Sequence, residues 1–295
     1  MNRRAFLAGS TGLACLATLG PRTASALAHA ASTPVAEDTF PTLAIGLKDD
    51  GFELPDAIQA GRYHVTVTNH GTSDASHSAL GRIPDQVTDA QYQEWLDSLS
   101  RTDGTDGQTD ALTWDDIEFV GMPDWPKAGQ SVSGVIDLAP GRYFLFDPFS
   151  SRGDMSLTIT GDPVSAPEPE SDLTVTLVDM KINLPDAAIT SKPVRWKIEN
   201  TGSISHEVAV IPVTPTFTEE DLTVLLSLPE DGTPPAGTDN LDYQPVAAIG
   251  ILAKGHTSWL DVKLTPGHYL AACMLPFGTG YPHAMDGMYR FFEVK

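Results

Sequence analysis

Apolar and polar residues alternate over short stretches along most of the chain, a pattern typical of strands. The segments RYHVTVTN at 62–69 and VRWKIEN at 194–200 are examples, and each leads into a turn. The chain of 295 residues contains 25 glycines and 23 prolines, and these separate many of the alternating runs. Short strands at this spacing predict an all-β fold of antiparallel sheets packed as sandwiches.

The strand pattern occurs twice along the chain. Three segments of the first half each resemble one of the second: 51–71 resembles 180–202, 75–84 resembles 204–213, and 134–148 resembles 259–275. A Pro/Glu/Ser-rich stretch at 163–172 has the composition of a linker. We therefore expect two tandem antiparallel Greek-key β-sandwiches, at 40–162 and 173–295.

Each half also contains one segment with helical periodicity, at 88–100 and at 218–228. Possible N-terminal capping pairs are Thr88 with Gln91 and Thr218 with Asp221. We expect one short amphipathic helix in each half, packed on its sandwich by its apolar side chains.

Residues 1–30 have the composition of an export signal. Arg3 and Arg4 precede an apolar run that is too short for a transmembrane helix, which needs about 20 residues. The paired arginines favour a twin-arginine signal, and a general secretory signal with two arginines is the alternative. We expect an exported protein, periplasmic or extracellular, with no membrane span in the mature chain.

Charge and cysteine content narrow the range of partners. The chain has 18 Lys and Arg against 39 Asp and Glu, a net charge of −21, which repels nucleic acid and anionic membranes. Cys15 lies within the expected signal, so Cys273 is alone in the mature chain and has no partner for an internal disulfide. Its thiol is unpaired, bonded to another molecule, or bound to a metal.

Cys273 opens the stretch CMLPFGTGYPHAMDGM, which also contains His283 and Met288. Thiolate, imidazole and thioether ligands together favour copper. His206 is the natural candidate for a second imidazole, although spacing alone cannot place it beside Cys273. The repeat puts Asp147 opposite Cys273, and the segment that follows Asp147 has no histidine.

Each candidate also has an ordinary structural interpretation. A lone cysteine in an apolar strand is usually a small buried hydrophobic residue, and methionines fill cores. His206 and His283 are compatible with hydrogen-bonded edge or turn positions. His77 matches His206 by position in the repeat but lacks a cysteine and a downstream histidine, so we expect a relic or a surface group there and not a ligand.

Taken together, the residues of the second half resemble those of the blue copper proteins, the cupredoxins. That family has an Asn-x-Gly turn, a His at the head of the next strand, and a final strand pair that carries Cys, His and Met. The matching residues here are Asn200, Gly202, His206, Cys273, His283 and Met288. The resemblance covers nearly all of 171–295 in pattern, and 40–162 in scaffold only.

The resemblance implies one copper ion in the second half. His206 and His283 would be imidazole ligands, Cys273 the thiolate and Met288 the axial thioether. Nine residues separate Cys273 from His283, more than is usual in the family, and Met285 is a competing thioether. Glu207 follows His206 where many members have Asn, a side chain that often ties the two ligand segments together.

The function implied is electron transfer by a copper-binding protein that meets a redox partner protein. We do not expect an enzyme, because multicopper oxidases and two-domain nitrite reductases need further copper held by clustered histidines, and no His-x-His pair occurs. The alternative is a metal-free, cupredoxin-like binding or structural module at the cell exterior.

Overall fold

The structure, a computed structural model, describes residues 40–74, 76–98, 109–147, 153–162, 165–185, 189–227, 244–276 and 281–295. The expected export signal at 1–30 lies outside these residues. Among the helices in the described part of the chain, none has the length and apolar character needed to cross a membrane.

Strands predominate in the described residues, which confirms the all-β prediction. In the N-terminal half they are β1 (Thr42–Lys48), β2 (Gly51–Glu53), β3 (Ile58–Gln59), β4 (Gly61–Asn69), β5 (Ala79–Ile83), β6 (Glu118–Phe119), β7 (Ser131–Leu138), β8 (Gly141–Phe146) and β9 (Asp154–Thr160). In the C-terminal half they are β10 (Leu173–Val178), β11 (Lys181–Asn183), β12 (Val194–Asn200), β13 (His206–Val213), β14 (Ala247–Leu252), β15 (Thr257–Val262), β16 (Gly267–Ala272) and β17 (Tyr289–Val294).

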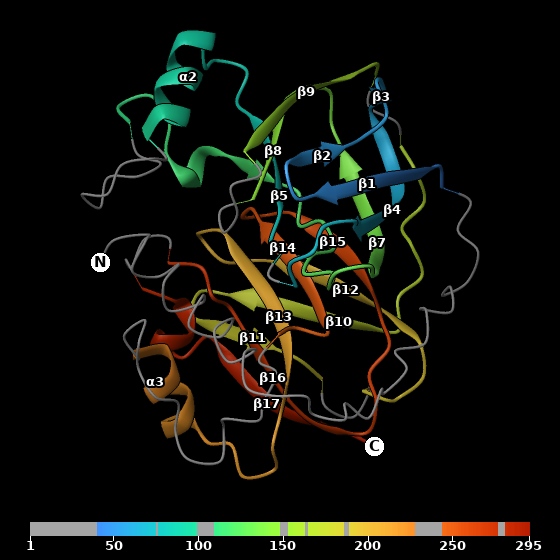
Figure 1. The fold of residues 1–295 in the computed structure, drawn as a ribbon, viewed down its shortest axis with the longest axis vertical. Coiled ribbons are helices and arrows are strands. Elements are labelled where there is room, and N and C mark those ends of the chain that lie inside the picture. The colour runs from blue at the N-terminus through green and yellow to red at the C-terminus, as the bar shows by residue number, and fades with distance from the viewer. Residues whose placement is uncertain are drawn as a thin grey trace.

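These strands form three sheets (Figure 1). A five-stranded sheet, β3-β9-β8-β5-β6, belongs to the N-terminal half, and a four-stranded sheet, β14-β13-β16-β17, belongs to the C-terminal half. The third sheet has eight strands in the order β11-β10-β12-β15-β7-β4-β1-β2 and contains strands of both halves. The two expected domains therefore share one sheet, and their independence as domains stays a prediction, as does the Greek-key connectivity.

Each small sheet packs on one end of the shared sheet, which gives the expected sandwiches. The sheets are mixed and not purely antiparallel as predicted, because β1 pairs with β4, β10 with β12, and β3 with β9 in parallel. In the N-terminal half, β1, β4 and β7 contribute Leu43, Ile45, Val65 and Ile136 to a buried cluster with Leu80 and Leu145 of β5 and β8. In the C-terminal half, β10, β12 and β15 contribute Val175, Trp196 and Leu260 to a cluster with Val208, Ala271 and Phe292 of β13, β16 and β17.

The predicted helices are present as α2 (Asp89–Ser98) and α3 (Glu219–Ser227), and two short 3₁₀ helices are η2 (Trp114–Asp116) and η4 (His283–Asp286). Both predicted capping pairs form. The Gln91 amide donates to Thr88 Oγ1 at 3.3 Å, and the Asp221 amide donates to Thr218 Oγ1 at 3.2 Å. Trp95 of α2 and Leu222 of α3 are buried, so each helix is attached through its apolar side chains.

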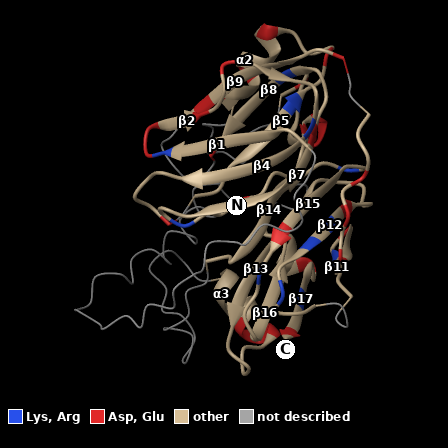
Figure 2. Ribbon diagram, turned by 90° about the vertical axis from the view of Figure 1, so that its right-hand side faces the viewer, with Lys and Arg blue, Asp and Glu red and all other residues tan. Residues whose placement is uncertain are grey.

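The two halves meet where β7 pairs with β15 in the middle of the shared sheet (Figure 2). The facing pairs are Trp259 with Val135 and Leu260 with Gly134. Gly134 pairs with Val65, which lies four residues before the turn residue Asn69. Leu260 pairs with Trp196, which lies four residues before the turn residue Asn200. Gly134 and Leu260 are thus equivalent residues that face each other, as an approximate two-fold axis between the halves requires.

Gly134 permits this junction because it has no side chain. A Cβ atom at position 134 would lie 2.1 Å from the carbonyl oxygen of Trp259, inside any allowed contact distance. The close approach of the two backbones therefore requires glycine on the β7 side.

A buried carboxylate reinforces the junction. Asp261 accepts hydrogen bonds from Arg195 Nε at 2.7 Å and Ser133 Oγ at 3.0 Å, and its Oδ2 lies 2.9 Å from His64 Nε2. Burial alone would raise the pKa of Asp261, but these interactions outweigh burial and hold that pKa below its usual value. A lowered carboxyl pKa contributes stability above the pKa of the unfolded state, and this is lost as the pH falls through the folded-state pKa.

We expect Gly134→Ala to lower the free energy of unfolding by about 3 kcal/mol or more, because the added methyl group forces β7 away from β15. Chemical denaturation followed by circular dichroism measures the change. Gly51→Ala is the matched control, since a Cβ atom there meets nothing within 4 Å. Equal stabilities of the two variants would contradict the close approach at Gly134.

Candidate metal centre

The chain brings the four candidate ligands to one end of the C-terminal sandwich. His206 is the first residue of β13, and Cys273 directly follows β16, its antiparallel neighbour. His283 begins η4, and Met288 lies between η4 and β17. All four side chains are 0% exposed.

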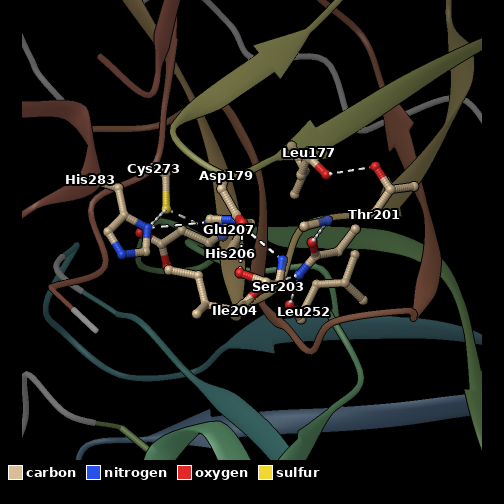
Figure 3. A network of polar contacts seen from close by, with 12 residues as sticks. Leu177, Asp179, Thr201, Ser203, Ile204, His206, Glu207, Leu252, Cys273 and His283 are labelled. Carbon is tan, nitrogen blue, oxygen red and sulfur yellow. Dashed lines mark hydrogen bonds and ion pairs between the residues drawn. The ribbon is translucent and has the colours of Figure 1, made fainter. Parts of the chain in front are cut away.

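Three of these side chains point at one another (Figure 3). His206 Nδ1 lies 3.2 Å from His283 Nδ1, which lies 3.3 Å from Cys273 Sγ, and the three donor atoms all fall within 4.8 Å of one another. Metal bonds of about 2.0 Å to nitrogen and about 2.3 Å to sulfur, the lengths zinc makes, hold trigonal ligands roughly 3.5 to 3.8 Å apart. The distances between the donor atoms here are slightly shorter, so a small outward shift of the side chains would give the spacing of a metal site.

Backbone hydrogen bonds return the long loop to the site. The His283 amide donates to the Leu275 carbonyl at 3.0 Å, and the Ala284 amide donates to the Cys273 carbonyl at 2.9 Å. The Cys273 amide donates to the Met288 carbonyl at 3.1 Å. The extra residues of the loop lie between Leu275 and His283, so its length does not carry His283 past Cys273.

Asp179, in the turn between β10 and β11, orients His206 (Figure 3). Its Oδ1 lies 3.2 Å from His206 Nε2, and its two oxygens also accept hydrogen bonds from the Ser203 amide at 2.8 Å and hydroxyl at 2.6 Å. A carboxylate at Nε2 favours the tautomer with the proton on Nε2, which leaves the lone pair of Nδ1 directed at the other two donors.

Asp179 was not among the predicted site residues, although the repeat contained a signal for it. Asp49 holds the equivalent turn of the N-terminal half, where its Oδ1 accepts the Thr72 amide at 2.8 Å. An aspartate at both turns is explained by turn geometry alone. The contact with His206 gives Asp179 a further role that turn geometry does not explain.

Glu207 ties the two ligand segments together. The connection that Asn makes in many cupredoxins is therefore made here by a glutamate. Its Oε1 accepts the Met274 amide at 3.0 Å, and its own amide lies 3.5 Å from Cys273 Sγ as a donor. The glutamate thus spans from β13 to the residue after Cys273.

The two methionines differ in burial. Met288 is fully buried in the same apolar cluster as Cys273, whereas Met285 is 40% exposed. Burial therefore favours Met288 over Met285 as a thioether near the three donors.

The environment keeps the Cys273 thiol and the His206 imidazole uncharged. Burial, and next the charge of Glu207, raise the pKa of the Cys273 thiol far above its usual value. Hydrogen bonds from the Glu207 and Leu275 amides lower this pKa but do not outweigh burial. Burial also lowers the pKa of His206, which outweighs the contribution of Asp179. A thiol and a neutral imidazole are therefore the forms present at neutral pH.

His77 was assigned wrongly in two respects. Ala79 of β5 pairs with the last residue of β8, and Ala209 of β13 pairs with the last residue of β16. His77 lies two residues before Ala79, and Glu207 lies two residues before Ala209. His77 is thus equivalent to Glu207 and not to His206. It is also 2% exposed, not a surface group.

No family model matches the sequence, and no curated protein matches it. Among solved structures, auracyanin B is 17% identical over 43% of this chain and 92% of its own, with a TM-score of 0.28. Auracyanin from the photosynthetic bacterium Roseiflexus castenholzii is 16% identical over 43% of this chain and 99% of its own, with a TM-score of 0.27. A multicopper oxidase is 13% identical over 85% of this chain and 88% of its own, with a TM-score of 0.23. All three structures are less than 25% identical to this chain, and all three TM-scores lie below 0.5.

We expect Cys273 in the folded, metal-free protein to react with iodoacetamide at least about a hundredfold more slowly than in urea, because the thiol is buried and its pKa is raised. Mass spectrometry of the peptide that contains Cys273 measures the extent of alkylation over time. Rapid alkylation of the native protein would show that the thiol is open to solvent.

Proposed function

We propose that this chain is an exported copper-binding protein that transfers electrons. The observation that carries the proposal is the convergence of Cys273 Sγ, His206 Nδ1 and His283 Nδ1 within 4.8 Å at a buried position. These donors come from β13, the end of β16 and η4, and hydrogen bonds to backbone atoms tie the three segments together.

The chemistry of the donors fits copper. One thiolate and two imidazoles with a weak thioether form a set that suits copper in both common oxidation states, and the resemblance to cupredoxins implies the same ligands. Met288 is the thioether we propose for the axial position, since it is buried beside Cys273. A bound copper ion would supply one-electron redox chemistry at this position.

The protein's part is to keep the donors in place while an electron arrives and leaves. Asp179 fixes the ring of His206, and Glu207 fixes the segment that carries Cys273. The buried position excludes water from the donors. Cys273 would hold a metal ion as a thiolate, and the Glu207 amide is placed to donate to that sulfur.

A carrier of this kind needs a partner, and we propose a redox partner protein that meets the chain outside the cytoplasm. Among the residues that the structure describes, the His206–Cys273–His283 cluster is the one group of three or more His, Cys, Asp or Glu side chains close enough to share a metal ion. One copper ion and electron transfer, rather than catalysis at several coppers, is the function this cluster supports.

Protein loaded with Cu(II) is expected to show an intense absorption band in the red part of the visible spectrum, from charge transfer between the Cys273 thiolate and copper. The Cys273→Ser variant should lose this band. Met285→Leu is the control, because Met285 is exposed and should not affect the band. Wild-type protein that binds Cu(II) without this band, or binds none, would defeat the proposal.

Asp179→Ala should weaken copper binding roughly 10–100-fold, because His206 loses the carboxylate that orients its ring. Competition titration with a chromophoric chelator measures the dissociation constant. Asp49→Ala removes the equivalent turn contact in the N-terminal half and controls for the cost to folding. Similar affinities for the two variants would show that Asp179 acts only on its turn.

A further inference from the structure

A cluster of ionisable side chains lies buried between the two halves, beside the metal centre but outside its donor set. It contains His77 and Asp124 from the N-terminal half and Glu207 from the C-terminal half, each at most 2% exposed. Asp147, the residue opposite Cys273 in the repeat, is also buried and raises the pKa of His77 through its charge. Buried charges of this kind need specific partners.

The backbone around Asp124 brings this cluster to the C-terminal half. The Gly121 amide donates to the Ile251 carbonyl at 2.9 Å, and the Asp124 amide donates to the Ala248 carbonyl at 3.0 Å. Residues 120–124 therefore lie along β14, the strand that pairs with β13. Asp124 is held by backbone hydrogen bonds on the side of the junction where Glu207 lies.

His77 stands between two carboxylates. Its Nδ1 makes an ion pair with Asp124 Oδ2, and its Nε2 lies 3.7 Å from Glu207 Oε2. Burial lowers the pKa of His77, but the charge of Asp124 and the hydrogen bond to it outweigh burial, so that the pKa is raised to about 9. Asp124 is fixed in turn by the Ser78 amide, which donates to its Oδ1 at 2.9 Å.

Glu207 carries the effect to the donor set. One carboxylate oxygen accepts the Met274 amide, while the other faces His77 and makes no hydrogen bond among the described residues. The Glu207 backbone amide is directed at Cys273 Sγ. A change at His77 therefore reaches the sulfur through a single side chain.

Trp125 gives His77 a fixed ring plane. The two rings stack at 5.2 Å between centroids with an interplanar angle of 25°. Trp125 has a φ of 62°, a left-handed conformation that is costly for a bulky residue and persists only where its surroundings impose it. This strained residue keeps the imidazole of His77 aimed at both carboxylates.

From this arrangement we infer that His77 is a positioning residue for the metal centre, and that the N-terminal half tunes the copper–thiolate bond of the other half through the chain Asp124–His77–Glu207. The inference rests on the proposed function. It gives the half without metal ligands a role in setting the reduction potential. The two-fold junction explains why His77 meets Glu207, since equivalent residues face each other across it.

The test is a double-mutant cycle on the copper-loaded protein. His77→Gln is expected to shift the reduction potential by an amount equal to at least a tenfold change in the equilibrium between the two copper states, about 59 mV. In a Glu207→Gln background, the same substitution should cause no further shift, because the carboxylate that faces His77 is absent.

A second measurement needs no metal. The Met274 amide donates a hydrogen bond to Glu207 Oε1. Its hydrogen exchange should be at least about tenfold faster in His77→Gln than in wild type. Asp124→Asn preserves the shape of its side chain and should cause the same change, so it replaces His77→Gln if that variant does not fold. Wild-type protein that binds no copper would defeat the proposed function, and the Met274 exchange rate would then decide the inference by itself.

His64→Gln is the matched control, because His64 also pairs with a carboxylate across the junction, Asp261, but does not contact Glu207. It should leave both the reduction potential and the Met274 exchange rate unchanged. An unshifted potential with unchanged exchange in His77→Gln would overturn the inference. So would an equal shift in the Glu207→Gln background, or effects of the same size in His64→Gln.

Discussion

The absence of a side chain at Gly134 is the constraint on which the rest of the molecule depends. It lets β7 approach β15 so closely that a Cβ atom would strike the Trp259 carbonyl. The pairing that results joins eight strands of both halves into one sheet. It also brings His64 and Asp261 together and sets His77 against Glu207. Both ion pairs and the surroundings of the donor cluster follow from this contact.

Local features of the fold were predictable from the sequence. Strand alternation, the Asn-x-Gly turn, and the capping pairs at Thr88 and Thr218 depend on neighbouring residues, so they are visible in a single chain. The donor set was different, because His206 and Cys273 are far apart in sequence. Only the resemblance to a known pattern suggested their meeting, and the structure places them together.

The features that were missed depend on contacts between the halves or between distant strands. Gly134 has the appearance of an ordinary strand glycine, and no local pattern marks it as a contact point. Asp179 is explained by its turn until His206 is placed beside it. His77 was matched to the wrong residue because the connection after Asn69 is longer than the one after Asn200, a difference that only the strand register reveals.

The two-fold junction has a consequence for self-association. A symmetric pairing would allow either half to dock on a second copy of itself, a known hazard of open strand edges. Here glycine stands on one side and leucine on the other. Two C-terminal halves would bring Leu260 to the position where no Cβ atom fits. The mismatch between these two residues thus favours the union of unlike halves over the pairing of two C-terminal halves.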